Sequence, residues 1–275
     1  MNTENIINSI GAEREQDAQD YIKDGLLFCH KCHTPKQCRT EILGRQRIVP
    51  CMCECEATEH KRKEAEEEKR KALEKISRLK AMGFPDDEMA EWTFDIDADP
   101  DSKVSKAARN YVENFDTFYK SGKGILFYGA VGTGKTFLSA CIVNALIEKG
   151  HPCLCTNFAR ITNTIQSKFE GRQEYLDSLN KFHLLVIDDL AAERDTEFMG
   201  EIIMNIIDSR YRAGKPIIVT TNLTAQELRN PANIRRARIF SRLFEMTVMI
   251  EVTGPDRRKQ KAIDDYGRFA QILGI

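Results

Sequence analysis

The chain has 275 residues, of which 41% are hydrophobic and 30% are charged, and its formal net charge at pH 7 is −1. These values fit a globular protein of one large or two unequal domains, and they exclude nucleic-acid binding through an overall positive charge, so that any such binding needs a local basic patch. No apolar stretch approaches the ~20 residues of a membrane-spanning helix, and the first residues lack the pattern of a secretory signal, so we expect a cytoplasmic protein without membrane contact.

The N-terminal part is marked by its cysteines, six of which fall between residues 29 and 55. In a cytoplasmic chain, such clustering indicates metal ligands more than disulfides. Two close pairs of cysteines bracket a hairpin predicted at residues 40–49, and tetrahedral Zn²⁺ takes four sulfur or nitrogen ligands, so we predict a structural zinc ribbon. The alternative is a group of free thiols. The expected ligands are Cys29 and Cys32 from the first pair, then Cys51 and Cys53 from the second, with Cys55 as an alternative member of the second pair.

Charge dominates the next segment, residues 56–83. Acidic and basic residues alternate, and several opposite charges stand four residues apart, which favours a solvent-exposed helix. Before the cysteines, isoleucines at 6, 7 and 10 predict a short helix or a partly ordered terminus. We therefore expect a zinc-binding domain over residues 1–55, a charged helical linker over 56–83 and a larger domain over 84–275.

The larger domain alternates between predicted helices and strands. Apolar runs predict five strands, and amphipathic stretches between them predict crossover helices, which indicates an α/β fold with a parallel sheet covered on both faces. One further helix, at 104–119, precedes the first strand. The strands are expected at residues 124–128, 151–156, 182–189, 214–221 and 247–252. The helices between them are expected at 137–147, near 158–161, at 170–180 and at 195–212, with one opening at 224–227 and one running to residue 244.

Residues 129–136, with the sequence GAVGTGKT, match the phosphate loop G-x-x-x-x-G-K-[ST] without a mismatch, between a predicted strand and a predicted helix. Glycines let the backbone point its N–H groups at a polyphosphate, and the start of the helix adds the positive end of its dipole. The alternative is a glycine-rich turn with an ordinary surface lysine. The residues expected to bind ATP and Mg²⁺ are Gly129, Ala130, Val131, Gly132, Thr133, Gly134, Lys135, Thr136 and Phe137, together with Asp188.

Asp188 and Asp189 end the apolar strand predicted at 182–189. A phosphate loop requires an acidic partner, so we expect Asp188 to hold Mg²⁺ together with Thr136, and Asp189 to orient and activate the attacking water. The alternative is a strand that ends in an Asx turn.

These motifs resemble those of the AAA+ ATPases and, among them, the DnaC/DnaI/IstB group of helicase loaders and their phage relatives. The resemblance covers roughly residues 84–275, and it depends on the phosphate loop, the strand LLVIDD before residue 190, the TTN sequence at 220–222 and the RIFSR sequence at 238–242. The predicted zinc ribbon resembles the N-terminal helicase-binding domain of DnaI-type loaders.

The resemblance implies roles for particular residues. Asn222 matches the sensor residue that places the attacking water. Arg238 matches the arginine finger that acts on a neighbouring subunit's nucleotide, with Arg242 as its companion. A second sensor corresponds loosely to Arg257 or Arg258. Since many AAA+ proteins have Glu at the position of Asp189, and since a finger in trans requires assembly, we expect slow ATP hydrolysis that assembly or DNA stimulates.

Three functions are consistent with these residues. The first is an ATP-dependent loader that delivers a replicative helicase to single-stranded DNA and self-associates through its ATPase domain, with Phe158 and Arg160 as candidate DNA contacts. The second is an IstB-like accessory ATPase of transposition. The third belongs to another class, a zinc-ribbon adaptor with a nucleotide-dependent switch and negligible turnover.

Overall fold

The computed structural model describes residues 17–42, 44–84, 86–167, 171–190 and 197–275, apart from the side chains at 260, 261 and 264. The isoleucine pattern at residues 6–10 lies outside the described residues. By its internal contacts the chain divides into two compact units, Met1–Glu74 and Lys75–Ile275. None of the described helices is long and apolar enough to cross a membrane.

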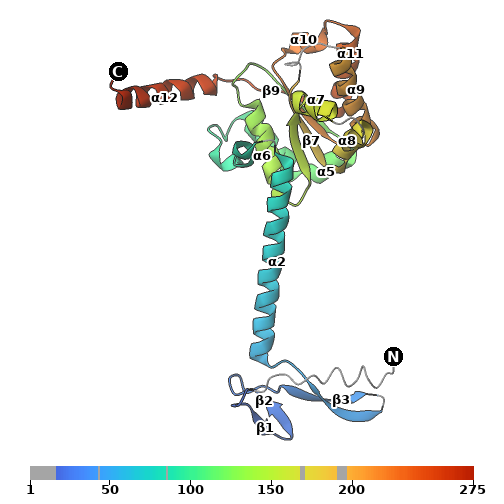
Figure 1. The fold of residues 1–275 in the computed structure, drawn as a ribbon, viewed down its shortest axis with the longest axis vertical. Coiled ribbons are helices and arrows are strands. Elements are labelled where there is room, and N and C mark those ends of the chain that lie inside the picture. Colours follow the sequence, from blue (N-terminus) through green and yellow to red (C-terminus); the bar gives the residue numbers. More distant parts are fainter. Residues whose placement is uncertain (1–16, 43, 85, 168–170, 191–196) are drawn as a thin grey trace. The chain divides into compact units, whose positions relative to one another are not determined.

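Two small antiparallel sheets precede the long helix in the described N-terminal unit (Figure 1). Strand β1 (Tyr21–Lys23) pairs with β2 (Leu26–Phe28), and β3 (Gln37–Ile42) pairs with β4 (Arg45–Pro50). The predicted hairpin at 40–49 is therefore confirmed and is longer than expected. Gly44 has a φ of 72° in the turn, a left-handed conformation that glycine adopts without steric cost.

Helix α2 (Glu54–Gly83) confirms the helix predicted from the alternating charges. Exposed ion pairs four residues apart line its first part, for example the pair of Arg62 with Glu66 at 2.6 Å. Such solvent-exposed pairs are individually weak, so the helix depends on many small contributions. Its last turns belong to the second unit, where Ile76 and Leu79 pack against the apolar core. It ends at Gly83, where an added Cβ would lie 2.8 Å from the Cys153 carbonyl oxygen.

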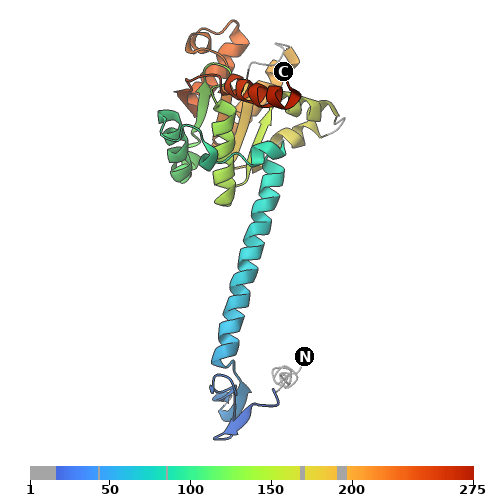
Figure 2. The same cartoon turned by 90° about the vertical axis from the view of Figure 1, so that its left-hand side faces the viewer.

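A five-stranded parallel sheet forms the centre of the second unit, in the order β6-β7-β8-β5-β9. This confirms the predicted α/β fold with a parallel sheet (Figure 2). The strands are β5 (Gly124–Tyr128), β6 (Cys153–Asn157), β7 (Leu184–Leu190), β8 (Ile217–Thr221) and β9 (Thr247–Glu251).

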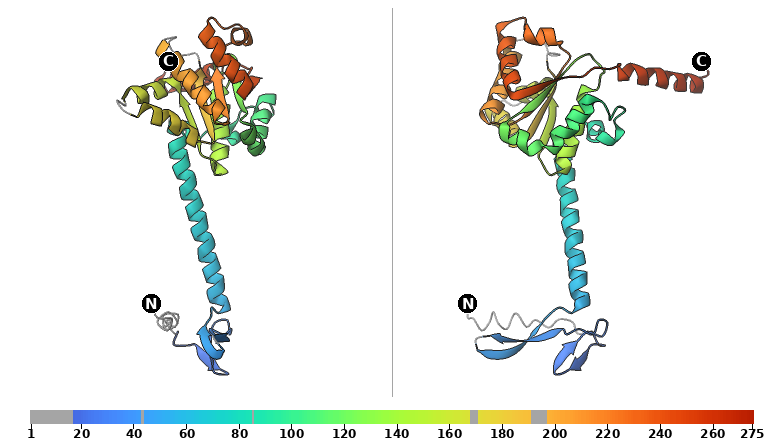
Figure 3. Two further views of the ribbon diagram at one scale, coloured as in Figure 1. Left: turned by 90° about the vertical axis from the view of Figure 1, so that its right-hand side faces the viewer. Right: turned by 180° about the vertical axis from the view of Figure 1, so that it is seen from behind.

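Helices cover both faces of this sheet, and Figure 3 shows them from two further sides. Alternate residues of β7 point to opposite faces: Leu184 and Val186 pack into one core, and Leu185 and Ile187 into the other. This explains why the strands read as continuous apolar runs. The first core includes α4 (Lys103–Glu113), α5 (Phe115–Ser121) and α6 (Lys135–Glu148), and the second includes α7 (Phe158–Ser167), α9 (Glu197–Arg212) and α11 (Ile234–Met246).

The single helix expected at 104–119 is wrong, because the chain breaks at Asn114 into α4 and α5. The Asn114 side chain donates to the Asn110 carbonyl, the kind of local bond by which Asn competes with the helical backbone. The short helices are α3 (Asp87–Ala90), η1 (Phe94–Ile96), α8 (Arg172–Ser178), η2 (Leu179–Lys181) and α10 (Ala225–Arg229), and α12 (Arg257–Leu273) ends the chain.

Arg210 of α9 is fully buried and holds together the ends of several elements. Its guanidinium donates to the backbone carbonyls of Phe182 at 2.9 Å and of His183 at 3.1 Å, and also to those of Leu179 and Pro216. Burial lowers its pKa to about 10, so the group stays charged at neutral pH.

We expect Arg210→Met to destabilise the protein by about 3 kcal/mol or more, because it leaves buried carbonyls without a donor. The measurement is the free energy of unfolding in urea. Arg212→Met, at an exposed position of the same helix, serves as the control and should change it by less than about 0.5 kcal/mol. Equal effects of the two substitutions would contradict the role given to Arg210.

Candidate active site and metal centre

The phosphate loop lies between the end of β5 and the start of α6, as the sequence predicts. Gly132 has a φ of 78°, and an added Cβ would lie 1.9 Å from an Asp256 carboxylate oxygen. At Gly129, with a φ of 134°, an added Cβ would lie 2.5 Å from the Val252 carbonyl oxygen. Both positions therefore require glycine. The segment before α12 packs directly on the loop, since the Arg257 backbone N–H donates to the Gly132 carbonyl at 3.0 Å.

The other residues of the loop take different positions. Ala130 and Val131 are exposed, whereas Thr133 is buried and its hydroxyl donates to the Ala130 carbonyl at 2.9 Å. Phe137, in the first turn of α6, packs against Trp92 with ring centroids 6.0 Å apart. Phe137 thus anchors the start of the helix that the loop precedes.

Lys135 is buried, with 6% of its surface exposed, and its ammonium donates to the carbonyls of Gly129 at 2.8 Å and Ala130 at 2.6 Å. Burial lowers the pKa of Lys135, the nearby charge of Arg258 acts in the same direction, and the carboxylates of Asp189 and Asp188 oppose the shift. A buried cation whose acceptors are carbonyls of the loop itself fits a loop built to hold phosphate oxygens.

Asp188 and Asp189 meet the phosphate loop at the end of β7. The Thr136 hydroxyl donates to Asp188 Oδ1 at 2.8 Å, and the Thr220 hydroxyl of β8 donates to the same oxygen at 2.6 Å. Two oxygen donors of the kind that Mg²⁺ prefers, a hydroxyl and a carboxylate, are therefore adjacent, as predicted for Thr136 and Asp188.

Asp189 has a φ of 61°, in the left-handed region. Its carboxylate accepts a hydrogen bond from the Asn222 side-chain amide at 2.7 Å, so the structure brings these two expected catalytic residues together. Burial and the charge of Asp188 raise the pKa of Asp189, whereas Lys135 and Arg258 lower it.

The two candidates for a second sensor both lie at the phosphate loop. The charge of Arg258 acts on Lys135 and Asp189. The guanidinium of Arg257 lies 3.7 Å from where a Cβ at Gly134 would be, and it faces the buried carboxylate of Asp97 at 3.6 Å.

Arg238 and Arg242 lie together on α11. Arg238 is exposed, whereas Arg242 stacks over the Tyr211 ring at 4.6 Å and pairs with Asp208 at 3.3 Å. Within the described residues, no hydrogen bond or ion pair joins either arginine to the phosphate loop of its own chain. An exposed Arg238 is compatible with action on a second copy.

Four cysteines of the N-terminal unit converge. The sulfur atoms of Cys29, Cys32, Cys53 and Cys55 all lie within 4.8 Å of one another, and none of these four cysteines is in a disulfide. The sequence favoured Cys51 over Cys55, but Cys51 lies outside this group, with its thiol 3.5 Å from the Pro35 carbonyl.

The geometry of the cluster fits a metal ion. Cys55 Sγ lies 3.5 Å from Cys29 Sγ and 3.3 Å from Cys53 Sγ, and tetrahedral zinc thiolates place their sulfurs about 3.8 Å apart. The neighbouring sulfurs of Cys53 and Cys29 raise the pKa of Cys55 to about 12. Ionising all four thiols therefore costs free energy, which a bound divalent cation would offset. The Thr34 hydroxyl and then the Cys55 backbone lower the pKa of Cys32 to about 5.

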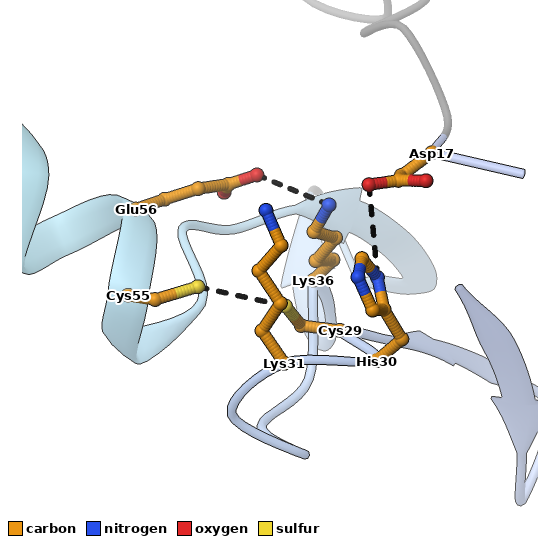
Figure 4. Close-up of a pocket in the computed structure, with 7 residues that line it drawn as sticks. All are labelled: Asp17, Cys29, His30, Lys31, Lys36, Cys55 and Glu56. Carbon is orange, nitrogen blue, oxygen red and sulfur yellow. Dashed lines mark hydrogen bonds and ion pairs between the residues drawn. The ribbon is translucent and has the colours of Figure 1, made fainter. Parts of the chain in front are cut away.

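Cys29 and Cys55 of this cluster line a pocket of about 720 Å³ together with Asp17, His30, Lys31, Lys36 and Glu56 (Figure 4). Asp20, buried in the N-terminal unit, bonds to His30 at 3.1 Å and to Lys36 at 2.6 Å, and Lys36 also pairs with Glu56 at 3.2 Å. His30 is thus engaged beside the cluster and is not one of the four. This network was not predicted, because no motif in the sequence marks these residues as partners.

The proposed base-stacking role of Phe158 is wrong. Its side chain is 2% exposed and belongs to the core beneath α7, so it cannot stack on a base. Arg160 is exposed and pairs with Asp86 at 2.8 Å. Phe158 directly follows β6 and is the first residue of α7, where helix periodicity in the sequence does not yet indicate which side of the helix faces the core.

Known protein families and proteins are similar in sequence to much of this chain. Residues 52–264, more than half of the chain, match the family of IstB-like ATP-binding proteins. The replicative helicase loader DnaC of Escherichia coli K12 is 32% identical over 125 residues, which are 44% of this chain and 50% of that protein. The loader DnaI of Bacillus subtilis strain 168 is 26% identical over 149 residues, 50% of this chain and 48% of that protein.

A solved structure shows the same fold. The crystal structure of DnaI superposes with a TM-score of 0.55 and 26% identity over 66% of this chain and 99% of that one. The sheet and its helices are therefore those of an AAA+ P-loop ATPase. The chain spans about half the length of the curated relatives it matches. With an intact phosphate loop and acidic pair on this fold, the chain belongs to the IstB-like ATP-binding protein family.

Proposed function

We propose that the second unit binds and hydrolyses ATP. The observation that carries this proposal is the chain of hydrogen bonds from Thr136 through Asp188 and Thr220 to Asp189, which Asn222 completes. Lys135 and the N–H groups of the loop would hold the β- and γ-phosphates. Thr136 and Asp188 would hold Mg²⁺, which supplies charge neutralisation at the transferred phosphoryl group.

Asp189 is the proton acceptor in this proposal. Asn222 donates to one of its carboxylate oxygens and leaves the other to orient a water molecule and accept its proton. Asp189 is exposed, so water reaches it from solvent. The shorter side chain of Asp compared with Glu is consistent with slow turnover.

We expect Asp189→Asn to lower the rate of ATP hydrolysis roughly 100-fold or more while the affinity for ATP changes little, because the amide cannot accept a proton. The measurement is phosphate release at saturating ATP, with and without single-stranded DNA. Asp101→Asn, an exposed carboxylate in the same unit, is the control and should hydrolyse ATP like the wild type. Hydrolysis by Asp189→Asn at the wild-type rate would contradict the role of Asp189.

We further propose that this ATPase is a helicase loader. The matched relatives from E. coli and B. subtilis are both replicative helicase loaders. In this proposal the partners are a replicative DNA helicase, single-stranded DNA and further copies of the chain, and Arg238 acts as the finger in trans. In this proposal residues 1–55 bind the helicase, residues 56–83 form the helical linker and residues 84–275 form the ATPase domain.

The first of these domains is proposed to contain a structural zinc ion held by Cys29, Cys32, Cys53 and Cys55. Their free thiols and mutual distances support four-sulfur coordination, which leaves no open position for a substrate. A closed site of this kind stabilises the fold around it.

A second candidate function is an accessory ATPase of transposition. The observation that favours it is the matching family, which is described as IstB-like. The N-terminal cysteine unit favours the loader, since it resembles the helicase-binding domain of DnaI-type proteins. Co-purification of the protein with a transposase in place of a helicase would support this second function.

A further inference from the structure

The ladder between β7 and β8 is interrupted at the acidic pair. Ile187 pairs with Val219, and the next pair is Leu190 with Thr221. Two residues, Asp188 and Asp189, therefore stand opposite one residue, Thr220. An irregularity of this kind leaves a backbone group without its ladder partner and re-aims the side chains around it.

The hydroxyl of Thr220 occupies this interruption. A hydroxyl can donate one hydrogen bond and accept two. Here it accepts from the Asp189 backbone N–H at 2.8 Å and donates to Asp188 Oδ1 at 2.6 Å. Thr220 is 1% exposed, so water does not replace these bonds.

The two bonds act on two different residues of the site. The bond from the Asp189 N–H stabilises the left-handed backbone conformation of Asp189, which has a φ of 61°. This conformation costs free energy for a residue other than glycine. The bond to Asp188 fixes the rotamer of that carboxylate while Thr136 bonds to the same oxygen. One buried hydroxyl therefore links the expected Mg²⁺ ligand to the expected proton acceptor.

We propose that Thr220 is a positioning residue for ATP hydrolysis, which sets the carboxylates of Asp188 and Asp189 through its single hydroxyl. This inference rests on the proposed ATPase function. It assigns to Thr220 no contact with the nucleotide. Its effect reaches the reaction only through the two aspartates.

The test compares Thr220→Val, which keeps the shape and removes the hydroxyl, with Thr220→Ser, which keeps the hydroxyl. Thr247→Val is the matched control, because Thr247 is also a buried threonine of the same sheet, with a hydroxyl that donates to the Leu243 carbonyl at 2.6 Å. All variants are measured as full-length protein. If Thr220→Val fails to fold, Thr220→Ala replaces it.

Two readouts are measured on each variant. The first, without nucleotide, is hydrogen exchange at the Asp189 amide, which should become roughly 10-fold faster or more in Thr220→Val and stay like the wild type in Thr220→Ser and Thr247→Val. The second is ATP hydrolysis, for which kcat should fall roughly 10- to 100-fold in Thr220→Val with KM changed less than about threefold, and recover in Thr220→Ser.

The outcomes separate this inference from the proposed function. Unchanged hydrogen exchange and unchanged kcat in Thr220→Val overturn the inference. A fall in kcat in Thr247→Val as large as that in Thr220→Val also overturns it. A wild type without turnover overturns the proposed ATPase function, and the exchange at Asp189 then still decides whether Thr220 holds the backbone. A fall in kcat that Thr220→Ser does not restore also contradicts the role of the hydroxyl.

Discussion

Lys135→Met is expected to lower ATP hydrolysis by roughly 100- to 1,000-fold and to weaken ATP binding. Methionine preserves much of the length and the apolar stem but has no charge. Lys135 is the buried cation of the phosphate loop, and its ammonium is already close to the loop carbonyls of Gly129 and Ala130. Phosphate oxygens at the loop would be better acceptors for this ammonium than neutral carbonyls.

The control for this prediction lies at the other end of the same helix. Lys149 also donates its ammonium to a backbone carbonyl, that of Val112 at 3.1 Å, but its side chain is exposed and far along the chain from the loop. Lys149→Met should therefore leave binding of a fluorescent ATP analogue and phosphate release near wild-type values. ATP binding by Lys135→Met as tight as by the wild type would show that the loop does not hold the phosphates.

Cys29→Ser is expected to abolish metal binding and to unfold the N-terminal unit around β1 to β4. Cys29 is 2% exposed in the cluster, and the small sheets of this unit have few buried apolar side chains, so under the zinc proposal the metal would supply much of the stability. Structural zinc contributes about 10–16 kcal/mol in small zinc-finger peptides, and a missing thiolate removes much of this. The wild type should carry one zinc ion per chain, and the variant none.

Elemental analysis and hydrogen exchange of residues 17–53 measure both parts of this result. Cys38→Ser is the control, because Cys38 lies exposed on β3, outside the cluster. It should retain the zinc ion, and both variants should still bind ATP, because the nucleotide site lies in the second unit. A wild-type protein free of zinc, or full zinc content in Cys29→Ser, would contradict the proposed metal centre.

The features that the sequence predicted well are those with a local pattern. The phosphate loop depends on closely spaced residues between a strand and a helix, and the alternation of strands and helices predicts the parallel sheet. Asp188 and Asp189 were predicted because they directly follow an apolar run of residues. Each of these patterns follows the order of residues along the chain, so no knowledge of contacts between distant segments was required.

Features that depend on distant pairing were not predictable in the same way. Thr220 acquires its role only because β8 lies beside the interrupted end of β7. The choice between Cys51 and Cys55 depends on where α2 begins. The helix starts at Glu54, earlier than the residue 56 expected from the charges, and its first turn brings Cys55 to the sulfur of Cys29.

The measurement that tests the central claim most directly is complex formation with the replicative helicase of the same organism, by mass-resolved co-purification of the full-length protein in the presence of ATP. The loader proposal predicts a defined complex for the wild type and for Cys38→Ser, and none for Cys29→Ser. Failure of the zinc-loaded wild type to bind the helicase, with capture of a transposase instead, would contradict the loader proposal and leave the ATPase assignment intact.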